Sequence, residues 1–339
     1  MILIGTSGYS FPDWVGPFYP EGTSRAQMLD YYVKQFPAVE VNATYYRIPP
    51  PSTLAAMERK TPAGFEFVIK TNAGMTHEGS TDPALYDSFR RAVEPVARAG
   101  KLAGYLAQFP WAFRPGPDSQ AHLRLLKKLL PGAPLFLEFR HRSWITDQTF
   151  RFLEDEGLHY VSVDEPDLPG LVPPLARATG DLAYVRLHGR NKENWWASAR
   201  AERAGSEAAD RDAEQVVERV VEAAAEETAA YPAQGSLDLF GTGGDSPARV
   251  GRGARRGAPA AGRGAGTGSA SASPGAPPAR PASSDRYDYL YSEQELRDWA
   301  EKIRELAMKS KKTFVFFNNC HVGQAATGAK LMRRLLEGP

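Results

Sequence analysis

Residues Leu135–Trp144 read LFLEFRHRSW, and this stretch decides the fold class. Its first six residues alternate between two sets, Leu-Leu-Phe and Phe-Glu-Arg, which is the period-two pattern of a β-strand. The second set ends in Glu138 and Arg140, whose side chains therefore point the same way. A strand that is apolar on both faces is typical of a buried parallel sheet, in which polar residues belong at the C-terminal end.

Seven further segments repeat this pattern, and helical segments separate them. The predicted strands cover residues 2–7, 38–42, 65–71, 102–108, 135–140, 160–164, 184–188 and 313–318. The predicted helices cover residues 24–36, 52–61, 82–99, 118–130, 146–156 and 287–308. Eight strands that alternate with helices predict an α/β fold of the TIM-type (β/α)8 barrel class. An open doubly wound sheet is the alternative, but no GxGxxG motif follows the first strand.

The composition indicates a soluble protein with a sizeable core. The chain has 339 residues, of which 42% are hydrophobic, and a net charge of +1, which gives no general attraction to nucleic acid or membrane. The single cysteine, Cys320, excludes an intramolecular disulfide and a cysteine-rich metal cage. The first residues lack the basic lead of a signal peptide, and no run reaches the ~20 apolar residues of a membrane helix. We therefore expect a cytoplasmic protein without a membrane contact.

Residues 197–285 do not fit the barrel pattern. Residues 202–227 have a helical pattern and contain nine Asp or Glu against three Arg. Residues 246–281 contain six Arg and no Asp, Glu or Lys, among Gly, Ala, Pro and Ser. Such a composition buries too little apolar surface to fold. We therefore predict three parts: barrel strands one to seven in residues 1–196, a long and largely disordered insertion in 197–285, and the rest of the barrel in 286–339.

The sequence resembles the YecE-like family, also called domain of unknown function 72. The matching segments include GTSGYSFPDWVGPFYP, VEVNATYYRIPP, GFEFVIKTNAGMTHE, LAQFPWAF, LEFRHRSW, YVRLHGRN, YDYLYSEQELRDWAEKI and FVFFNNCHVGQAA. The resemblance implies a TIM-type barrel and no settled activity. Two departures from the family pattern stand out: the long insertion, and the pair Gly328-Ala329 where the family tends to carry Asn-Ala.

Polar residues gather at the predicted C-terminal strand ends, where barrel enzymes place their active sites. The candidates for acid–base catalysis are Glu40, Glu138, Asp164 and His188. The candidates for ligand binding are Asn42, Lys70, Gln108, Arg140, Arg186, Arg190 and Asn318. The alternative is a purely structural network of buried ion pairs that closes the barrel.

The balance of these side chains favours an anionic ligand. One lysine and three arginines outnumber the carboxylates, and guanidinium groups bind carboxylate or phosphate oxygens in pairs. We therefore predict a phosphate-bearing small molecule as the ligand. A divalent metal held by His188, Glu138 and Asp164, with His77 and Glu78 nearby, is a weaker alternative, because no HxH or HExxH spacing supports it.

The segment Gln234–Phe240, QGSLDLF, resembles the bacterial sliding-clamp-binding motif Gln-x-x-Leu-x-Leu-Phe. Gln234, Leu237, Leu239 and Phe240 occupy its anchor positions. Such a peptide places apolar anchors in a hydrophobic pocket, and an unfolded tether leaves the barrel unchanged. The Arg/Gly-rich segment that follows can contact nucleic acid through phosphates. A stray apolar cluster and a solvated linker are the alternatives.

Two classes of function follow from these observations. The first is an enzyme of the phosphodiesterase or nuclease type, which the clamp motif recruits to DNA. The second is a non-catalytic accessory protein whose barrel binds a small anion. A sugar-phosphate isomerase or a glycosidase is a third alternative, because TIM-type barrels host many chemistries.

Overall fold

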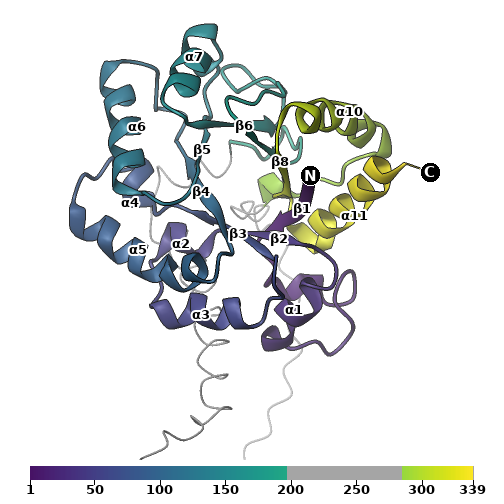
Figure 1. The fold of residues 1–339 in the computed structure, drawn as a ribbon. Helices are drawn as coiled ribbons and strands as arrows, with labels where there is room; N and C mark the ends of the chain where they lie inside the picture. Colours follow the sequence, from purple (N-terminus) through teal and green to yellow (C-terminus); the bar gives the residue numbers. More distant parts are fainter. Residues whose placement is uncertain (197–284, 339) are drawn as a thin grey trace, which may run out of the picture. The chain divides into compact units, whose positions relative to one another are not determined.

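A computed structural model of the chain describes residues 1–196 and 285–338. Eight parallel strands follow one another around a closed barrel in chain order (Figure 1). β1 also pairs with β8, so the barrel sheet has no free edge. The predicted TIM-type barrel is confirmed. The strands are β1 (Ile2–Ser7), β2 (Ala38–Val41), β3 (Glu66–Lys70), β4 (Leu102–Gln108), β5 (Leu135–Glu138), β6 (His159–Asp164), β7 (Leu182–Leu187) and β8 (Lys312–Phe317).

Helices surround the barrel (Figure 1). Two short ones, α2 (Ala43–Tyr46) and α4 (Ala73–Thr76), follow β2 and β3 at the C-terminal end of the barrel. The 3-10 turns are η1 (Pro12–Trp14), η2 (Arg142–Trp144), η3 (Asp285–Tyr287) and η4 (His321–Gly323). The longer helices are α1 (Arg25–Tyr32), α3 (Pro51–Arg59), α5 (Pro83–Arg98), α6 (Pro117–Leu129), α7 (Asp147–Asp155), α10 (Glu293–Lys309) and α11 (Gln324–Glu337). Within the described ranges, no helix is long and apolar enough to span a membrane.

The predicted start of the helix at residue 287 is wrong. α10 begins at Glu293, because Ser292 and Glu295 form a capping box in which each side chain bonds the backbone N–H of the other residue. Residues 288–291, before the cap, are not helical, and they include two tyrosines whose hydroxyls donate hydrogen bonds. The hydroxyl of Tyr291 donates to Asp164 and that of Tyr289 to Glu295. The apolar periodicity that predicted a helix from residue 287 therefore includes a non-helical segment, and this segment anchors α10 to the barrel.

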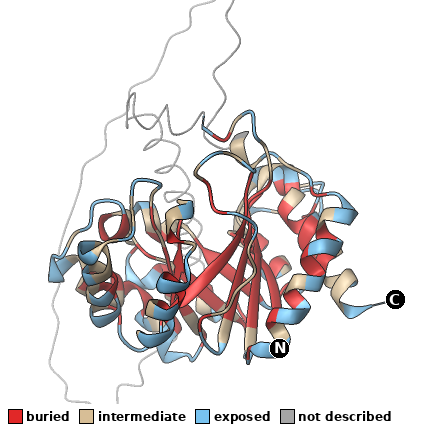
Figure 2. Ribbon diagram, turned by 90° about the horizontal axis from the view of Figure 1, so that it is seen from above, coloured by how far each residue is buried: buried red, intermediate tan, exposed pale blue. Residues whose placement is uncertain are grey.

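Apolar side chains fill the barrel interior, so the barrel has a packed core and not an open pore. Phe136 and Tyr184 lie with ring centroids 4.8 Å apart, and Phe314 lies 5.7 Å from Phe136. Gly104 makes room for the large ring, since a Cβ there would lie 2.4 Å from the Phe136 side chain. Figure 2 shows the strands mostly buried, with intermediate exposure at some strand ends, and the outer faces of the helices exposed. Ligand chemistry is therefore confined to the ends of the barrel.

The described chain leaves the barrel after Trp196 and returns at Asp285, and the two ends lie close together. The ring centroids of Trp195 and Tyr287 are 6.4 Å apart, and the Arg286 guanidinium lies 6.0 Å from the Trp195 ring. The predicted insertion starts and ends within one residue of this break. Its predicted helix at residues 202–227, the clamp-like segment and the Arg-rich stretch lie outside the described residues.

Candidate functional site

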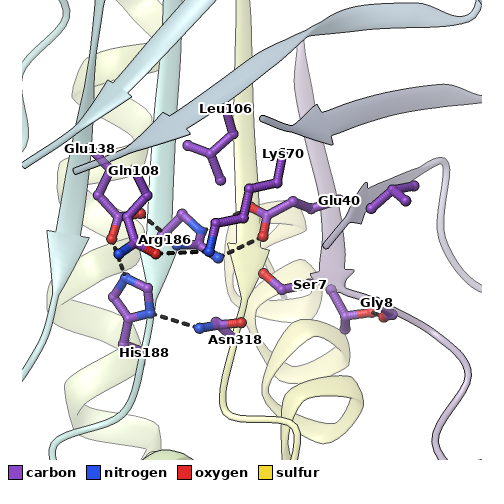
Figure 3. A network of polar contacts seen from close by, with 12 residues as sticks. Ser7, Gly8, Glu40, Lys70, Leu106, Gln108, Glu138, Arg186, His188 and Asn318 are labelled. Atoms are coloured by element: carbon purple, nitrogen blue, oxygen red, sulfur yellow. Dashed lines mark hydrogen bonds and ion pairs between the residues drawn. The ribbon is translucent and has the colours of Figure 1, made fainter. Parts of the chain in front are cut away.

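Arg186 is the centre of the polar network at the C-terminal mouth (Figure 3). It points inward from β7 and is only 1% exposed. Its Nε donates to Glu40 Oε2 at 2.9 Å and its Nη2 to Glu40 Oε1 at 2.6 Å, while Nη1 reaches Glu138 Oε2 at 2.5 Å. Tyr184 adds a hydrogen bond to Glu40 Oε2 at 2.6 Å. One guanidinium thus bridges the two central carboxylates.

His188 is fixed by bonds to both of its ring nitrogens. Nε2 lies 3.1 Å from Glu138 Oε1, and Asn318 Nδ2 lies 2.9 Å from Nδ1 (Figure 3). Burial and the nearby Arg140 charge hold the pKa of His188 well below its ordinary value, so the ring is neutral. The neutral ring donates from Nε2 to the carboxylate and accepts the Asn318 amide at Nδ1. This arrangement favours a positioning role for His188 over the predicted role of general base.

Arg140 extends the network to a carboxylate that the sequence analysis did not select. Its Nε lies 3.0 Å from Glu138 Oε1, and its Nη1 donates to Glu165 Oε2 at 2.7 Å. Burial opposes the ionisation of Glu138, but Arg140 and Arg186 together hold its pKa well below the ordinary value. Burial raises the pKa of Glu165 to about 7, against the attraction of Arg140. Glu165 directly follows Asp164, the last residue of β6, and this position next to a strand end was the only sequence feature that pointed to it. Beyond the strand end, alternation no longer fixes the direction of the side chain.

Lys70, at the end of β3, has only neutral partners among the described residues. Its Nζ donates to Gln108 Oε1 at 2.9 Å and lies 4.2 Å from the centroid of the Tyr45 ring. Burial, with the Arg186 charge adding to it, lowers the pKa of Lys70 to about 7. Lys70 is thus a half-buried amine without a carboxylate partner in a mouth whose guanidinium groups are all paired with carboxylates.

The side chains of Asp164 and Arg190 bond each other and the α10 region, and not Glu138 or His188, among the described residues. Arg190 binds both oxygens of Asp164, at 2.8 and 2.9 Å. The Tyr291 hydroxyl and the Trp299 indole N–H also donate to Asp164, at 2.7 and 2.9 Å. Arg190 makes a further ion pair with Glu295 at 3.0 Å. These contacts fasten α10 to the ends of β6 and β7, and they leave no oxygen of Asp164 without a donor.

Some buried polar atoms at the mouth have no hydrogen-bond partner among residues 1–196 and 285–338. They include Asn42 Oδ1, Ser7 Oγ and Asn319 Oδ1. Asn42 follows Val41, which pairs with Ile69, so Asn42 lies at the level of Lys70 on the neighbouring strand. Ser7 lies near Glu40 and Asn318 (Figure 3). Because buried polar atoms are normally satisfied, the mouth has unused bonding capacity at the ends of β1 and β2.

The structure does not assemble the metal set considered from the sequence. In the part of the chain that it describes, no three His, Cys, Asp or Glu residues come together as a metal site. Asp164 is held in its own cluster, and His188 and Glu138 bond each other. His77 Nδ1 lies 3.0 Å from Thr76 Oγ1, and burial, Lys70 and Arg140 lower the pKa of His77 to about 4. The network contains paired charges, not a coordination shell.

These contacts define a parallel (β/α)8 barrel whose C-terminal mouth carries a buried, internally paired polar network. The chain belongs to the DUF72 family, described as proteins of unknown function, whose model matches residues 3–234 and 267–339. Of the predicted insertion, therefore, only residues 235–266 lie outside the family pattern. The expectation that the whole insertion departs from the family is wrong.

Relatives from several bacteria are similar to this chain in sequence, and solved structures are similar to it in fold. The UPF0759 protein YunF of Bacillus subtilis is 29% identical over 99% of this chain and 95% of its own length. The UPF0759 protein YecE of Escherichia coli K12 is 27% identical over 48% of this chain and 57% of its own length. The crystal structure of a DUF72 family protein from Thermotoga maritima is similar with a TM-score of 0.70 and 32% identity, over the full length of both chains. A DUF72 family protein from Enterococcus faecalis, 21% identical with a TM-score of 0.67, has the same fold.

Proposed function

We propose that the barrel mouth binds a small anionic molecule that carries a phosphate group. The observation that carries this proposal is Lys70, a half-buried amine whose partners among the described residues are a neutral amide and an aromatic ring. An anion beside Nζ would stabilise the charged form of the lysine and so bind more tightly in this setting than in water. The ligand would thus supply the negative charge beside Lys70 that the described residues do not provide.

The residues available to such a ligand differ from the set chosen from sequence. Lys70, Gln108 and Asn42 line one side, and Ser7 adds a hydroxyl without a partner among the described residues. Arg140 contributes positive charge from the next strand end, above all when Glu165, with a pKa of about 7, is protonated. The charges of Arg186 and Arg190 are already matched by carboxylates, so these residues shape the mouth and do not bind the ligand.

Calorimetric titration of the full chain with inorganic phosphate and with sulfate tests this proposal. We expect binding that Lys70→Met weakens at least about tenfold, since one charge-assisted contact contributes roughly 1.5–3 kcal/mol. Lys330→Met is the matched control, because the Lys330 amine also lies over an aromatic ring, 4.8 Å from Phe18, but on α11. Binding that both variants retain equally would remove the proposed site.

A second candidate function is hydrolysis of a phosphate ester, and Glu165 is the observation that favours it. A carboxyl with a pKa of about 7 is suited to proton transfer at neutral pH. Hydrolysis of bis(4-nitrophenyl) phosphate, with and without added Mn²⁺, tests this function. Turnover that Glu165→Gln abolishes supports it, whereas phosphate binding without turnover supports the non-catalytic accessory protein. A glycosidase is not favoured, because Arg186 engages both Glu40 and Glu138.

The clamp-like segment, Gln234–Phe240, would determine where in the cell the barrel acts. It begins at Gln234, where the first part of the family match ends, so six of its seven residues lie in the segment that the family model does not cover. A partner-binding peptide added to a shared barrel would have this position. We infer that it recruits the barrel to a bacterial sliding clamp, and that the Arg/Gly-rich segment adds contacts to nucleic acid phosphates.

A further inference from the structure

Lys70 differs from the other inward or paired lysines of the described barrel in the chemistry of its partners. Lys101 lies 2.8 Å from Glu58, Lys311 lies 2.9 Å from Asp181, and Lys312 pairs with Glu66. Each of these amines is held in its charged form by a carboxylate. Lys70 instead donates to the Gln108 amide oxygen and lies over the Tyr45 ring. Its amine is therefore the one in this comparison whose lone pair can be freed without breaking an ion pair.

The position of the amine suits a reaction with a bound molecule. Lys70 Nζ projects from the end of β3 into the polar network at the mouth (Figure 3), and barrel active sites lie at this end of the strands. Gln108 holds Nζ at 2.9 Å, which limits its motion. Burial lowers the pKa of the amine to about 7, so that a large fraction is neutral and nucleophilic at physiological pH. The charged groups that act on it are Arg186, Glu138, Glu40 and Arg140, and the titratable ring of His77, with a pKa of about 4, lies nearby in its neutral form.

We propose that the Lys70 amine forms an imine with an aldehyde or ketone that also carries an anionic group. The proposal rests on the anion site inferred above, because Arg140, Asn42 and Ser7 in the same mouth would hold the charged end of the molecule while Lys70 bonds its carbonyl carbon. It adds a reactive group, the carbonyl, to the expected ligand. It also assigns Lys70 the role of a catalytic residue, one that bonds the substrate covalently.

The step is balanced without an oxidant or reductant. The nitrogen lone pair attacks the carbonyl carbon, a C–N bond forms, and the carbonyl oxygen takes up a proton to give a carbinolamine. The hydroxyl then leaves as water after a second protonation, and the nitrogen loses both of its original protons in the course of the reaction. The products are a neutral imine and one water molecule, and protonation of the imine gives an electron-withdrawing centre next to the substrate carbon.

Reductive trapping tests the proposal on the full chain. The protein is incubated with glyceraldehyde 3-phosphate and sodium cyanoborohydride at pH 7, and the modified lysines are mapped by peptide mass spectrometry. We expect an adduct on Lys70 at least tenfold above that on any other lysine. The rate should be half-maximal near pH 7, and Lys70→Arg should abolish the specific adduct, whereas Lys330→Arg retains it. The map of adducts on the wild-type protein does not depend on whether any variant folds.

Unsubstituted glyceraldehyde and phosphate titration separate the two proposals. Phosphate binding together with labelling spread evenly over the surface lysines overturns the imine and leaves the anion site standing. A Lys70-specific adduct that glyceraldehyde forms as readily as its phosphate supports the imine and contradicts the anion site. A specific adduct that the phosphate group accelerates supports both. If the protein shows no phosphate binding and no specific labelling of Lys70, both proposals are overturned.

Discussion

Arg186 on β7 binds both carboxylate oxygens of Glu40 on β2, at 2.9 and 2.6 Å, across the interior of the barrel mouth. Both side chains are withdrawn from water, with exposures of 1% and 0%. A buried pair of this kind adds little net stability compared with an apolar pair, but it is costly to break on one side. The network is therefore a constraint on the shape of the mouth more than a source of stability.

Replacement of Arg186 by Met should lower the free energy of unfolding by roughly 3–5 kcal/mol, because Glu40 and Glu138 then remain buried without their shared cation. Urea unfolding measures this change. Lys311→Met is the control, because it removes an exposed ion pair with Asp181 and should cost at most ~1 kcal/mol. Equal losses in the two variants would contradict the bridging role of Arg186.

Lys70→Met should raise the free energy of unfolding at pH 7 by roughly 0.5–2 kcal/mol while it removes anion binding, as is common for residues kept for function. The amine is partly desolvated in the folded chain and fully charged in the unfolded chain, so folding works against its charge. Thermal unfolding of Lys70→Met beside Lys330→Met tests this expectation. A loss of stability in Lys70→Met would mean that the lysine serves the fold.

Sulfate affinity should fall by about tenfold or more between pH 6 and pH 8.5, because Lys70 loses its charge as the pH rises through its pKa of about 7. Sulfate is the suitable probe because it does not titrate in this range. Deprotonation of Glu165 acts in the same direction. Lys70→Arg, which stays charged, should lose most of the dependence, and an unchanged pH profile in that variant would assign the effect elsewhere.

His188 and Glu165 should change stability with pH in opposite directions. The folded pKa of His188 lies well below its unfolded value, so its contribution to stability is full above about pH 6.5 and is lost as the pH falls. The folded pKa of Glu165 is raised to about 7, so its contribution grows as the pH falls from about 7 toward its unfolded value near 4.3. Relative to the wild type, His188→Gln should gain stability on acidification and Glu165→Gln should lose it.

Urea unfolding at pH 7.5 and pH 5.5 measures both differences. One proton per molecule limits each slope to about 1.4 kcal/mol per pH unit. If both variants change in parallel with the wild type, then neither residue titrates between these pH values in the way that the burial of their side chains implies.

The full chain should bind a bacterial sliding clamp with micromolar or tighter affinity. Combined replacement of Gln234, Leu239 and Phe240 by Ala should abolish this binding, because the apolar anchors and the polar contact are lost together. Ser236→Ala is the control, since Ser236 occupies a variable position of the motif. Surface plasmon resonance with immobilised clamp measures the affinity. Binding that the triple variant retains would make the segment a linker.

The fold was predictable from sequence because strand alternation is a local property. The pattern at Leu135–Glu138 and at seven similar segments requires no knowledge of neighbours, and all eight strands occur where it indicates. The partners at the mouth were not predictable in this way. Arg190 pairs with Asp164, and Arg140 pairs with Glu165, only when the barrel is closed and α10 is packed against it. A count of charges thus suggested several free cations, whereas folding leaves only Lys70, of the four cations predicted at the mouth, without a carboxylate among the described residues.

The contact between Trp195 and Tyr287 has a consequence for the length of the chain between them. Since the flanking residues already meet at the rim, added residues cost the barrel only loop-closure entropy, about 0.6 kcal/mol for each doubling of the loop. Lengthening or shortening that loop therefore changes the stability of the barrel very little. This position on the rim of the barrel can therefore tolerate insertions and deletions during evolution without a change in the register of the strands.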